Sequence, residues 1–276
     1  MTLIAAVTGA SRGIGRATAL MLAERGYRVF ALARTGSALD ELAAEARAAG
    51  HDLRPIVMDI GDEAARQAGA KAVFAATDGY GVDVLVNNAG YGQMGAVEDV
   101  PGAALRAQFE VNVFGLIEFT KLLLPSMRER HHGYIVNLSS AAGRFTSPYM
   151  GVYSASKYAL ESLSDALRRE LAPFGVHVVL IEPGPIRSHF GRVAGEQAAG
   201  TSASPYHRLA TAYGSASHTN DLFQRSSQTV ARVILRAVQS PHPRARYRIT
   251  FPARMAELAR VLPDRLVDWG IRRVMD

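Results

Sequence analysis

The sequence predicts an α/β fold built on a doubly wound parallel sheet, and three observations support that prediction. Short apolar runs typical of buried strands alternate with helical patterns along most of the chain. A glycine-rich turn joins the first apolar run to the first helix. At 276 residues the chain is long enough for a full hydrophobic core. We therefore expect a single domain of about seven strands with helices on both faces.

Composition narrows the class of protein. Apolar residues make up 48% of the chain, as expected of a globular protein, and cysteine is absent. The absence of cysteine excludes disulfides, thiolate chemistry and cysteine-ligated zinc, and it favours a reducing compartment. No apolar run reaches membrane-spanning length, and the start of the chain lacks the basic region of a signal peptide. We expect a cytoplasmic protein.

The charge balance is basic, with a net charge of +6 and an isoelectric point of about 9.8. A basic balance can indicate nucleic-acid binding, but the arginines here are scattered among aspartate and glutamate on helical faces. No basic run with interleaved aromatic residues stands out. We interpret the charge as a solvated surface, with one or two arginines available for an anionic cofactor.

The first strand and helix frame a candidate phosphate-binding turn. An apolar run over 3–7 leads into Thr8-Gly-Ala-Ser-Arg-Gly-Ile-Gly15, and a helical pattern follows over 14–25. Glycines let the backbone approach a pyrophosphate, and a helix N-terminus offers unpaired N–H groups. The alternative is a glycine-rich turn without a ligand. The spacing matches neither the general G-x-G-x-x-G fingerprint nor a Walker A loop.

The second strand, over 28–33, indicates which dinucleotide the turn would bind. In NAD sites an acid near this strand end bonds the ribose 2′-hydroxyl, whereas an arginine accommodates a 2′-phosphate. Here the strand ends in Ala33-Arg34, with no carboxylate until Asp40. Arg12 could flank the same phosphate. The sequence therefore favours NADP over NAD.

The remaining elements follow in alternation. Helices are expected over 37–50, 62–77, 101–130, 153–171 and 228–239, and strands over 53–58, 82–86, 133–138, 175–181 and 246–250. Ligands of such sheets bind at the carboxyl ends of the strands. Those ends carry Thr8, Ala33, Asp59, Asn87, Ser140 and Pro183.

A tyrosine and a lysine lie one turn apart on the expected helix over 153–171. Because residues four apart share a helix face, Tyr153 and Lys157 should present a phenol and an ammonium side by side. A free phenol has a pKa of about 10, and a nearby cation lowers it. We therefore expect Lys157 to lower the pKa of Tyr153 toward useful proton transfer. Taken alone, such a pair is more often two unrelated surface residues, because this spacing of tyrosine and lysine is frequent by chance.

Two further polar features could be part of a functional site. Asn112 lies within an apolar helical pattern, where it must be hydrogen-bonded, either as a structural plug or as part of a proton relay. His131 and His132 fall in a turn without a second ligand cluster, so we expect them to be exposed and expect no metal site.

Together these motifs resemble the short-chain dehydrogenase/reductase family, from residue 3 to about 190. The resemblance implies a Rossmann-like domain and a catalytic tetrad of Asn112, Ser140, Tyr153 and Lys157; Ser139 stands at the wrong distance from Tyr153. The residues it implies for cofactor binding are Thr8, Gly9, Ser11, Arg12, Gly13, Ile14, Gly15, Arg34, Asp59, Ile60, Asn87, Ala89, Gly90, Tyr153, Lys157, Pro183, Gly184, Ile186 and Ser188.

Three segments resemble a particular branch of the family. These are Val111-Asn-Val-Phe-Gly115, Glu161-Ser-Leu-Ser-Asp165 and Glu182-Pro-Gly-Pro-Ile186, which look like the 17β-hydroxysteroid and retinol dehydrogenases. The resemblance implies an NADP(H)-dependent oxidoreductase acting on a carbonyl or secondary alcohol. In it, Tyr153 would exchange the proton, Lys157 would hold the nicotinamide ribose, Ser140 would bond the substrate oxygen and Asn112 would anchor a water. A homodimer or homotetramer is expected from the family.

Two other functions remain open at this stage. One is a catalytically idle NADP-binding regulator on the same fold, although such proteins usually lose the tyrosine or the lysine. The other is a nucleic-acid binder, which only the isoelectric point suggests. We expect no nucleic-acid partner.

The last third of the chain is the variable part. We expect a Rossmann-fold catalytic domain over 1–251, with a substrate lid at about 187–226, and a basic amphipathic extension over 252–276. The extension could dock on the body, which we favour, or cover the pocket, contact a partner subunit or lie on an anionic membrane. Candidate pocket residues are Gln93, Met94, Phe145, Pro148, Tyr149 and Met150, which suggest an apolar substrate.

Overall fold

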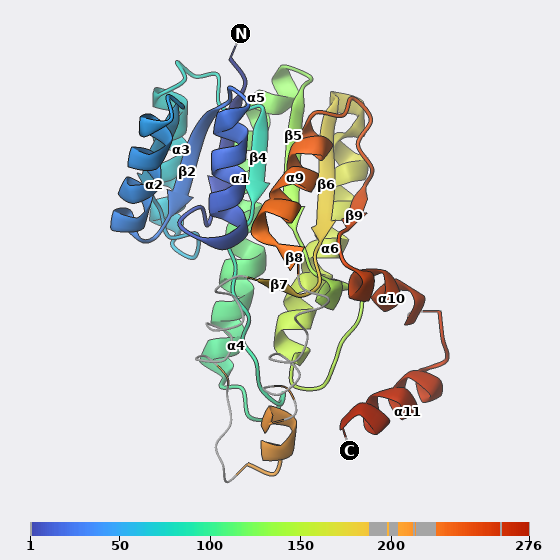
Figure 1. Cartoon of the computed structure of the whole chain (residues 1–276). Helices are drawn as coiled ribbons and strands as arrows, with labels where there is room; N and C mark the ends of the chain where they lie inside the picture. Colours follow the sequence, from blue (N-terminus) through green and yellow to red (C-terminus); the bar gives the residue numbers. More distant parts are fainter. Residues whose placement is uncertain are drawn as a thin grey trace.

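The protein is described here by a computed structural model, which covers residues 2–187, 198, 204–211, 213, 225–259 and 261–275. Seven parallel strands form its main sheet in the order β3-β2-β1-β4-β5-β6-β9 (Figure 1). Their bounds are Ile4–Thr8 for β1, Arg28–Ala33 for β2, Leu53–Val57 for β3, Val84–Asn87 for β4, Gly133–Leu138 for β5, Val176–Glu182 for β6 and Arg246–Arg248 for β9. This architecture confirms the predicted doubly wound fold.

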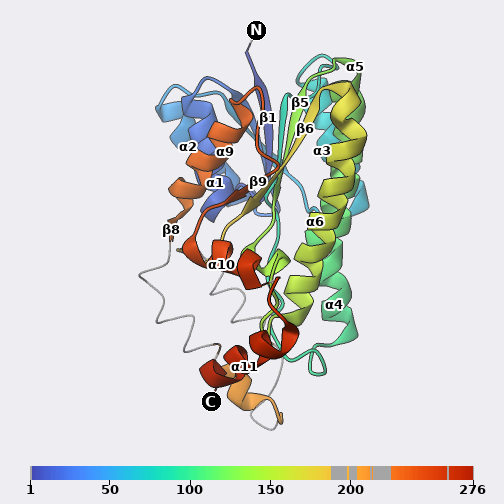
Figure 2. The same cartoon turned by 90° about the vertical axis from the view of Figure 1, so that its right-hand side faces the viewer.

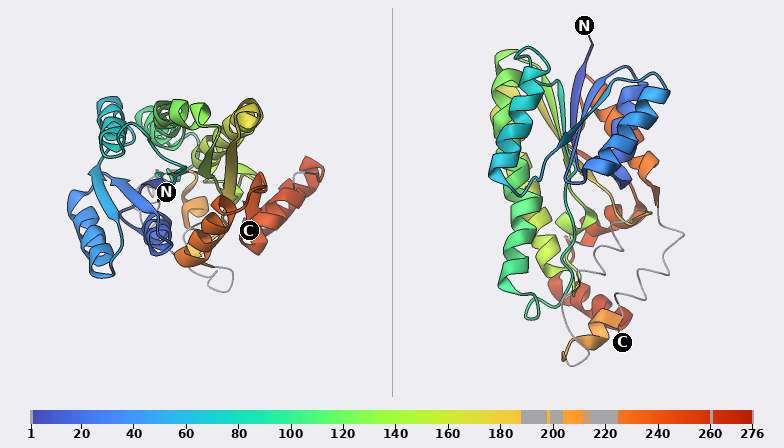
Figure 3. Two further views of the ribbon diagram at one scale, coloured as in Figure 1. Left: turned by 90° about the horizontal axis from the view of Figure 1, so that it is seen from above. Right: turned by 90° about the vertical axis from the view of Figure 1, so that its left-hand side faces the viewer.

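Helices cover both faces of the sheet, as Figures 2 and 3 show. One layer contains α1 (Gly13–Glu24), α2 (Gly36–Ala48) and α9 (Ser227–Val238); the other contains α3 (Glu63–Ala75), α5 (Gly115–Glu129) and α6 (Gly151–Leu171). Successive side chains of β2 alternate between the two cores: Val29 packs in the first and Phe30 in the second. Both faces of the central strands are therefore apolar, which explains their unbroken hydrophobic runs.

The long helix expected over 101–130 is real but is not uniform. It consists of α4 (Gly102–Phe109), a π-helical segment η1 (Glu110–Phe114) and α5. Such π segments are rare and occur frequently at functional sites. Here the segment contains Asn112, and it ends where Gly115 meets the β3–α3 loop, so closely that a Cβ on Gly115 would lie 2.1 Å from the Ile60 carbonyl oxygen.

Smaller departures from the predicted elements concern their ends. The second helix begins at Gly36, one residue before the expected start at 37, and its N-terminus has no side-chain cap. Two short strands, β7 (Ile186–Arg187) and β8 (Arg225–Ser226), pair with each other at the two ends of the predicted lid. Most of the lid itself, 187–226, lies outside the described residues, as does Ser188.

The C-terminal extension forms two helices with different surroundings. α10 (Phe251–Ala259) packs against β9 and against the 3-10 turn η2 (Ala141–Gly143), at the carboxyl end of the sheet. α11 (Asp264–Met275) stands off from the sheet in Figures 1 and 2, with Leu266 and Trp269 each 58% exposed. The expected docking on the body thus holds for α10. In the described part of the chain, no helix is both long and apolar enough to cross a membrane.

Candidate active site

The turn after β1 is a backbone cradle. Gly9 and Gly13 have φ values of +66° and +58°, which favour glycine because a Cβ is strained there. Gly15 opens α1 behind the turn, and a Cβ on it would lie 2.3 Å from the Gly9 carbonyl oxygen. Ser11, Arg12 and Ile14 complete the turn, and Arg12 is exposed. The helix N-terminus and the glycines therefore lie together, as anion binding requires.

The turn is fastened to the loop after β4. Thr8 is buried, and its Oγ1 accepts hydrogen bonds from the backbone N–H groups of Asn88 and Ala89, each at 3.0 Å. In return the Asn88 amide donates to the Thr8 carbonyl oxygen at 2.9 Å. Thr8 thus positions two loops at once. Asn88 has an equal share in this link, although the sequence interpretation did not count it among the site residues.

Exposed charges lie at the ends of β2 and β3. The Arg34 side chain is 68% exposed, and its Nη1 lies 4.0 Å from Oδ2 of Asp59. The other Asp59 oxygen accepts the Gly61 N–H at 2.9 Å, which fixes the carboxylate. The Ile60 side chain is buried, and its carbonyl oxygen accepts from the buried Arg66 at 2.7 Å. Arg34 therefore keeps a guanidinium free of close ion pairing at the strand end where a 2′-phosphate is expected.

Tyr153 and Lys157 lie on the first turns of α6 and are both buried. The Lys157 Nζ is 5.9 Å from the centroid of the Tyr153 ring and donates to the Leu138 carbonyl oxygen at 2.7 Å. The predicted pairing of phenol and ammonium on one helix face is therefore present.

The expected effect of Lys157 on Tyr153 is wrong for this structure. Burial raises the pKa of Tyr153 to about 12, and a hydrogen bond with Ser140 only partly offsets that rise. Burial likewise lowers the pKa of Lys157 to about 8, while the Glu161 carboxylate acts to raise it. Desolvation is the largest cause of both shifts, because both side chains are buried. The phenol is protonated at neutral pH.

Ser140 is held by the end of β5 and by the turn after β6. Its Oγ accepts the Ala142 N–H at 3.1 Å as the N-cap of η2. The next residue, Ala141, donates its N–H to the Pro183 carbonyl oxygen at 2.8 Å. Ser139 is buried and points elsewhere, near Gly143. Ser140, and not Ser139, therefore meets the Tyr153 phenol.

Asn112 is fully buried in η1 and holds the loop after β4. Its Oδ1 accepts the Tyr91 N–H at 3.1 Å, and its Nδ2 donates to the Tyr91 carbonyl oxygen at 2.9 Å and to Ser156 Oγ at 3.2 Å. A Cβ on Gly90 would lie 3.0 Å from Asn112 Oδ1 and 3.8 Å from Lys157 Nζ. Asn112 is thus a hydrogen-bonded structural link next to Lys157.

The other predicted site residues fall in two groups. Ala89, Gly90, Pro183 and Gly184 lie on the loops that face Thr8 and Ser140, and Ile186 opens β7 next to them. Asn87 differs, because its buried side-chain amide donates to Thr120 Oγ1 at 2.8 Å and to Asn137 Oδ1 at 2.9 Å. Its side chain belongs to the interior of the sheet.

A small apolar cluster adjoins Tyr153. Met94, Ala142 and Tyr149 are buried there with Tyr153, and Met150, Leu209 and Tyr213 pack against them. The Tyr149 and Tyr213 rings lie 5.5 Å apart. Three of the predicted pocket residues, Met94, Tyr149 and Met150, are therefore together.

Two polar residues with a role in the site were missed. Gln108 is buried one turn before Asn112; it donates to the Tyr91 carbonyl oxygen at 2.9 Å and accepts the Gln93 N–H. Its spacing of four from Asn112 was a usable signal, since both project from one helix face. Arg144 lies behind Ser140 and pairs with Glu257, 113 residues further along the chain, which no local sequence pattern predicts.

These residues fit a dinucleotide. The glycine cradle leaves no room for a Cβ at Gly15, and Arg12 and Arg34 supply exposed positive charge for phosphates. Within the described residues, no group of three or more potential ligands could hold a metal ion.

The comparisons agree with this geometry. The model of the short chain dehydrogenase family matches residues 3–199. The chain belongs to the short-chain dehydrogenase/reductase family. It is therefore a member of a family of oxidoreductases that act on small molecules.

Three members of this family show how far the similarity extends. The NADPH-dependent 3-dehydrocapnine reductase of Ornithobacterium rhinotracheale is 34% identical over 269 residues, which cover 96% of this chain and 94% of that protein. Human 17-beta-hydroxysteroid dehydrogenase type 1 is 34% identical over 251 residues, covering 87% and 75%. A crystal structure of a short-chain dehydrogenase from Streptomyces avermitilis has a TM-score of 0.83 at 34% identity and covers 100% of both chains.

Proposed function

We propose that this short-chain dehydrogenase/reductase is an NADP(H)-dependent enzyme that reduces a carbonyl, or oxidises the corresponding secondary alcohol, of an apolar substrate. The observation that carries the proposal is that half-buried Ser140 meets the buried Tyr153 and Lys157 at the carboxyl edge of the sheet, next to a backbone cradle for phosphates.

The residues divide the work of carbonyl reduction. The nicotinamide would supply the hydride. Tyr153 is a protonated phenol at neutral pH, because burial raises its pKa to about 12, and it donates that proton to the developing alkoxide. Ser140 already bonds the phenol and can share the same substrate oxygen. In alcohol oxidation the proton returns to Tyr153.

Lys157 and Asn112 serve the proton donor. The pKa of Lys157 is lowered to about 8 by burial, so its ammonium remains largely charged at neutral pH and stabilises negative charge on the phenol oxygen after proton transfer. We assign it the ribose hydroxyls of the cofactor as well. Asn112 holds the Tyr91 backbone beside Lys157 and would anchor a water that reconnects the lysine to solvent.

The preference for NADP rests on Arg34 and on the residue before it. Ala33 stands where a carboxylate would bond a ribose 2′-hydroxyl, and Arg34 offers an exposed guanidinium there. A relative that matches almost the whole chain is NADPH-dependent. Both observations favour a 2′-phosphate.

The substrate class follows from the cluster around Tyr153. Met94, Ala142, Tyr149 and Leu209 surround the phenol with apolar and aromatic surface. Such lining favours a bulky apolar carbonyl compound over a small polar one. Assembly into a homodimer or homotetramer stays a prediction.

The first experiment is a screen of NADPH oxidation with ketosteroids, retinal, quinones and 3-oxoacyl thioesters, followed by Tyr153→Phe on the best substrate. Removal of the hydroxyl keeps the ring and deletes the proton donor, so kcat should fall about a hundredfold or more. NADPH binding, followed by fluorescence, should persist.

Tyr158→Phe is the matched control, because Tyr158 lies on the same helix and is 37% exposed. It should turn over like the wild type. Near-normal turnover by Tyr153→Phe would overturn the assignment, and NADPH binding without turnover of any substrate would favour an idle regulator.

A further inference from the structure

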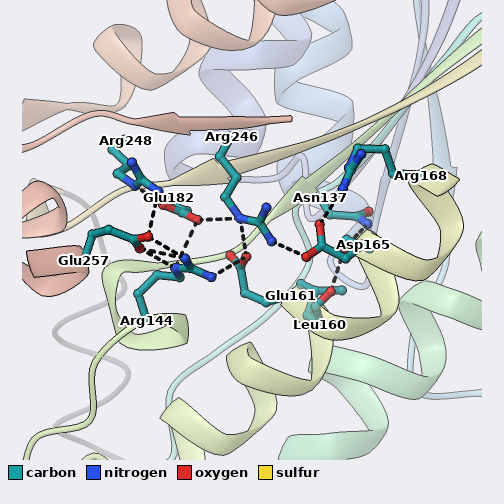
Figure 4. A network of polar contacts seen from close by, with 11 residues as sticks. Asn137, Arg144, Leu160, Glu161, Asp165, Arg168, Glu182, Arg246, Arg248 and Glu257 are labelled. Carbon is teal, nitrogen blue, oxygen red and sulfur yellow. Dashed lines mark hydrogen bonds and ion pairs between the residues drawn. The ribbon is translucent and has the colours of Figure 1, made fainter. Parts of the chain in front are cut away.

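Behind the catalytic residues lies a cluster of charged side chains drawn from distant parts of the chain (Figure 4). We call it the charged cluster; its members are Arg144, Glu161, Asp165, Glu182, Arg246, Arg248 and Glu257. They come from the end of η2, from α6, β6 and β9, and from α10 of the C-terminal extension. None of these contacts is needed for the proton transfer proposed above, so the cluster calls for its own explanation.

Arg144 and Glu257 form the closest link between the extension and the catalytic segment. Arg144 Nε and Nη2 donate to the two Glu257 oxygens, each at 2.8 Å, which is the bidentate arrangement that holds a guanidinium most firmly. The Arg144 side chain is only 13% exposed and that of Glu257 is 36% exposed, so water reaches this pair mainly from the Glu257 side. Arg248 supports the same carboxylate at 3.4 Å.

Arg144 also ends the turn that carries Ser140. Its N–H donates to the Ala141 carbonyl oxygen at 3.0 Å, and Ala141 is the residue after Ser140. A displacement of the Arg144 side chain would therefore move η2, because a single short turn joins them. Arg144 Nη1 further lies 3.9 Å from Glu161, one helical turn after Lys157.

α10 also contacts the turn after β6. A Cβ on Gly184 would lie 2.2 Å from Thr250 Oγ1 and 3.7 Å from the Ala253 nitrogen, so the start of α10 is packed tightly on the turn after β6. The residue before Gly184, Pro183, accepts the Ala141 N–H. Both supports of Ser140 thus end on α10.

We propose that Glu257 is a positioning residue for Ser140: through Arg144, it holds η2 where the Ser140 hydroxyl meets the Tyr153 phenol. The C-terminal extension is then a working part of the active site. This inference rests on the proposed function only for its kinetic readout.

The charges of the cluster favour this role for Glu257. Glu182 is fully buried and faces Glu161 on α6, Arg144 after η2, and Arg246 and Arg248 on β9. Burial, with the Glu161 carboxylate, raises its pKa to about 7, so the interior of the cluster carries less negative charge than its formula suggests. Arg144 and Arg248 are correspondingly available to Glu257.

The experiment compares Glu257→Gln with wild type in the full-length chain. Hydrogen exchange, read by mass spectrometry, should become about tenfold faster at the amides of 141–145, because their support on α10 is lost. The kcat for the substrate found by screening should fall about tenfold, while the Kd for NADPH changes less than about twofold, because the phosphate cradle lies elsewhere. Arg144→Lys keeps the charge but loses the fork, and it should shift both readouts in the same direction.

Glu118→Gln is the control, since it removes the exposed pair with Lys121 on α5 and should leave both readouts unchanged. In an Arg144→Gln background, Glu257→Gln should have no further effect on exchange at 141–145. Unchanged exchange there, in both Glu257→Gln and Arg144→Lys, would overturn the inference. The exchange result does not depend on turnover, so an inactive wild type would count against the proposed function alone.

Discussion

The phosphate cradle and the charged cluster lie at the same carboxyl edge of the sheet and are built on opposite principles. The cradle, from Thr8 to Gly15, is made of backbone: glycine conformations and contacts that leave no space for a Cβ. The charged cluster is made of long side chains from five separate elements, joined by ion pairs. A site built from backbone atoms tolerates almost no added side-chain atom. In a charge network, a residue that loses one partner still has others.

This difference between the cradle and the charged cluster predicts where a substitution has the largest effect. At the cradle, an added Cβ has no space, because it would meet backbone atoms and the Asn88 side-chain amide, which is itself hydrogen-bonded to Thr8. In the cluster, Arg246 contacts Glu161, Asp165 and Glu182 together, so losing one acid leaves it two. Five substitutions test this contrast.

The largest effect is expected from Gly15→Ala. The new Cβ would lie 2.3 Å from the Gly9 carbonyl oxygen, so the cradle must open. We expect a loss of about 3 kcal/mol in the free energy of unfolding, measured in urea, and NADPH binding too weak to detect. Gly26→Ala is the control: its φ is +82° with open space around it, so it should cost about 1 kcal/mol from backbone strain and leave NADPH binding intact. If both variants lost the same stability and the same NADPH binding, steric crowding at Gly15 would not explain the sensitivity of the cradle.

Glu182→Gln tests the cluster through pH. Because the folded state raises the pKa of Glu182 to about 7, that state holds the proton more tightly than the unfolded chain does. The stabilisation is present below about pH 4.5 and is lost as pH rises through about 7, an effect on the order of 3 kcal/mol. Glutamine cannot titrate, so the variant should lack this decline.

The measurement is the difference in unfolding free energy between wild type and Glu182→Gln at about pH 5 and about pH 8. Asp52 and Asp165 add nothing to this change, because their pKa values are lowered and both carboxylates are ionised between about pH 5 and about pH 8 in the folded and unfolded states. A difference that does not change with pH would mean that Glu182 is ionised throughout.

The same contrast explains what the sequence could predict. The glycine spacing, the strand and helix alternation, and the positions of Asn112, Ser140, Tyr153 and Lys157 are local patterns, and the structure brings the last three together as expected. The pairing of Arg144 with Glu257 spans 113 residues and follows no local period. The pKa of Tyr153 was predicted in the wrong direction because burial, the largest cause of its shift, depends on the packing of the whole site.

Arg34→Ala tests an exposed side chain outside the cradle that we assign to the same cofactor. Its guanidinium is 68% exposed, so the substitution should leave stability nearly unchanged. If it binds a 2′-phosphate, kcat/KM with NADPH should fall about tenfold to a hundredfold, as expected for a lost charged hydrogen bond, while kcat/KM with NADH stays the same. A wild-type preference for NADH would contradict the proposed role of Ala33 and Arg34.

The smallest effects are expected at two helix caps that lie outside both the cradle and the charged cluster. Asp62 accepts the Ala65 N–H at the start of α3, and Ser226 accepts the Thr229 N–H at the start of α9. Either change to alanine removes one partner from an otherwise unpaired N–H, so each should cost about 1 kcal/mol in urea unfolding. Neither cap touches the cradle or the charged cluster, so NADPH binding should not change. If Ser226→Ala lowered the free energy of unfolding much more than Asp62→Ala, the pairing of β7 with β8 next to Ser226 would contribute stability beyond that of a helix cap.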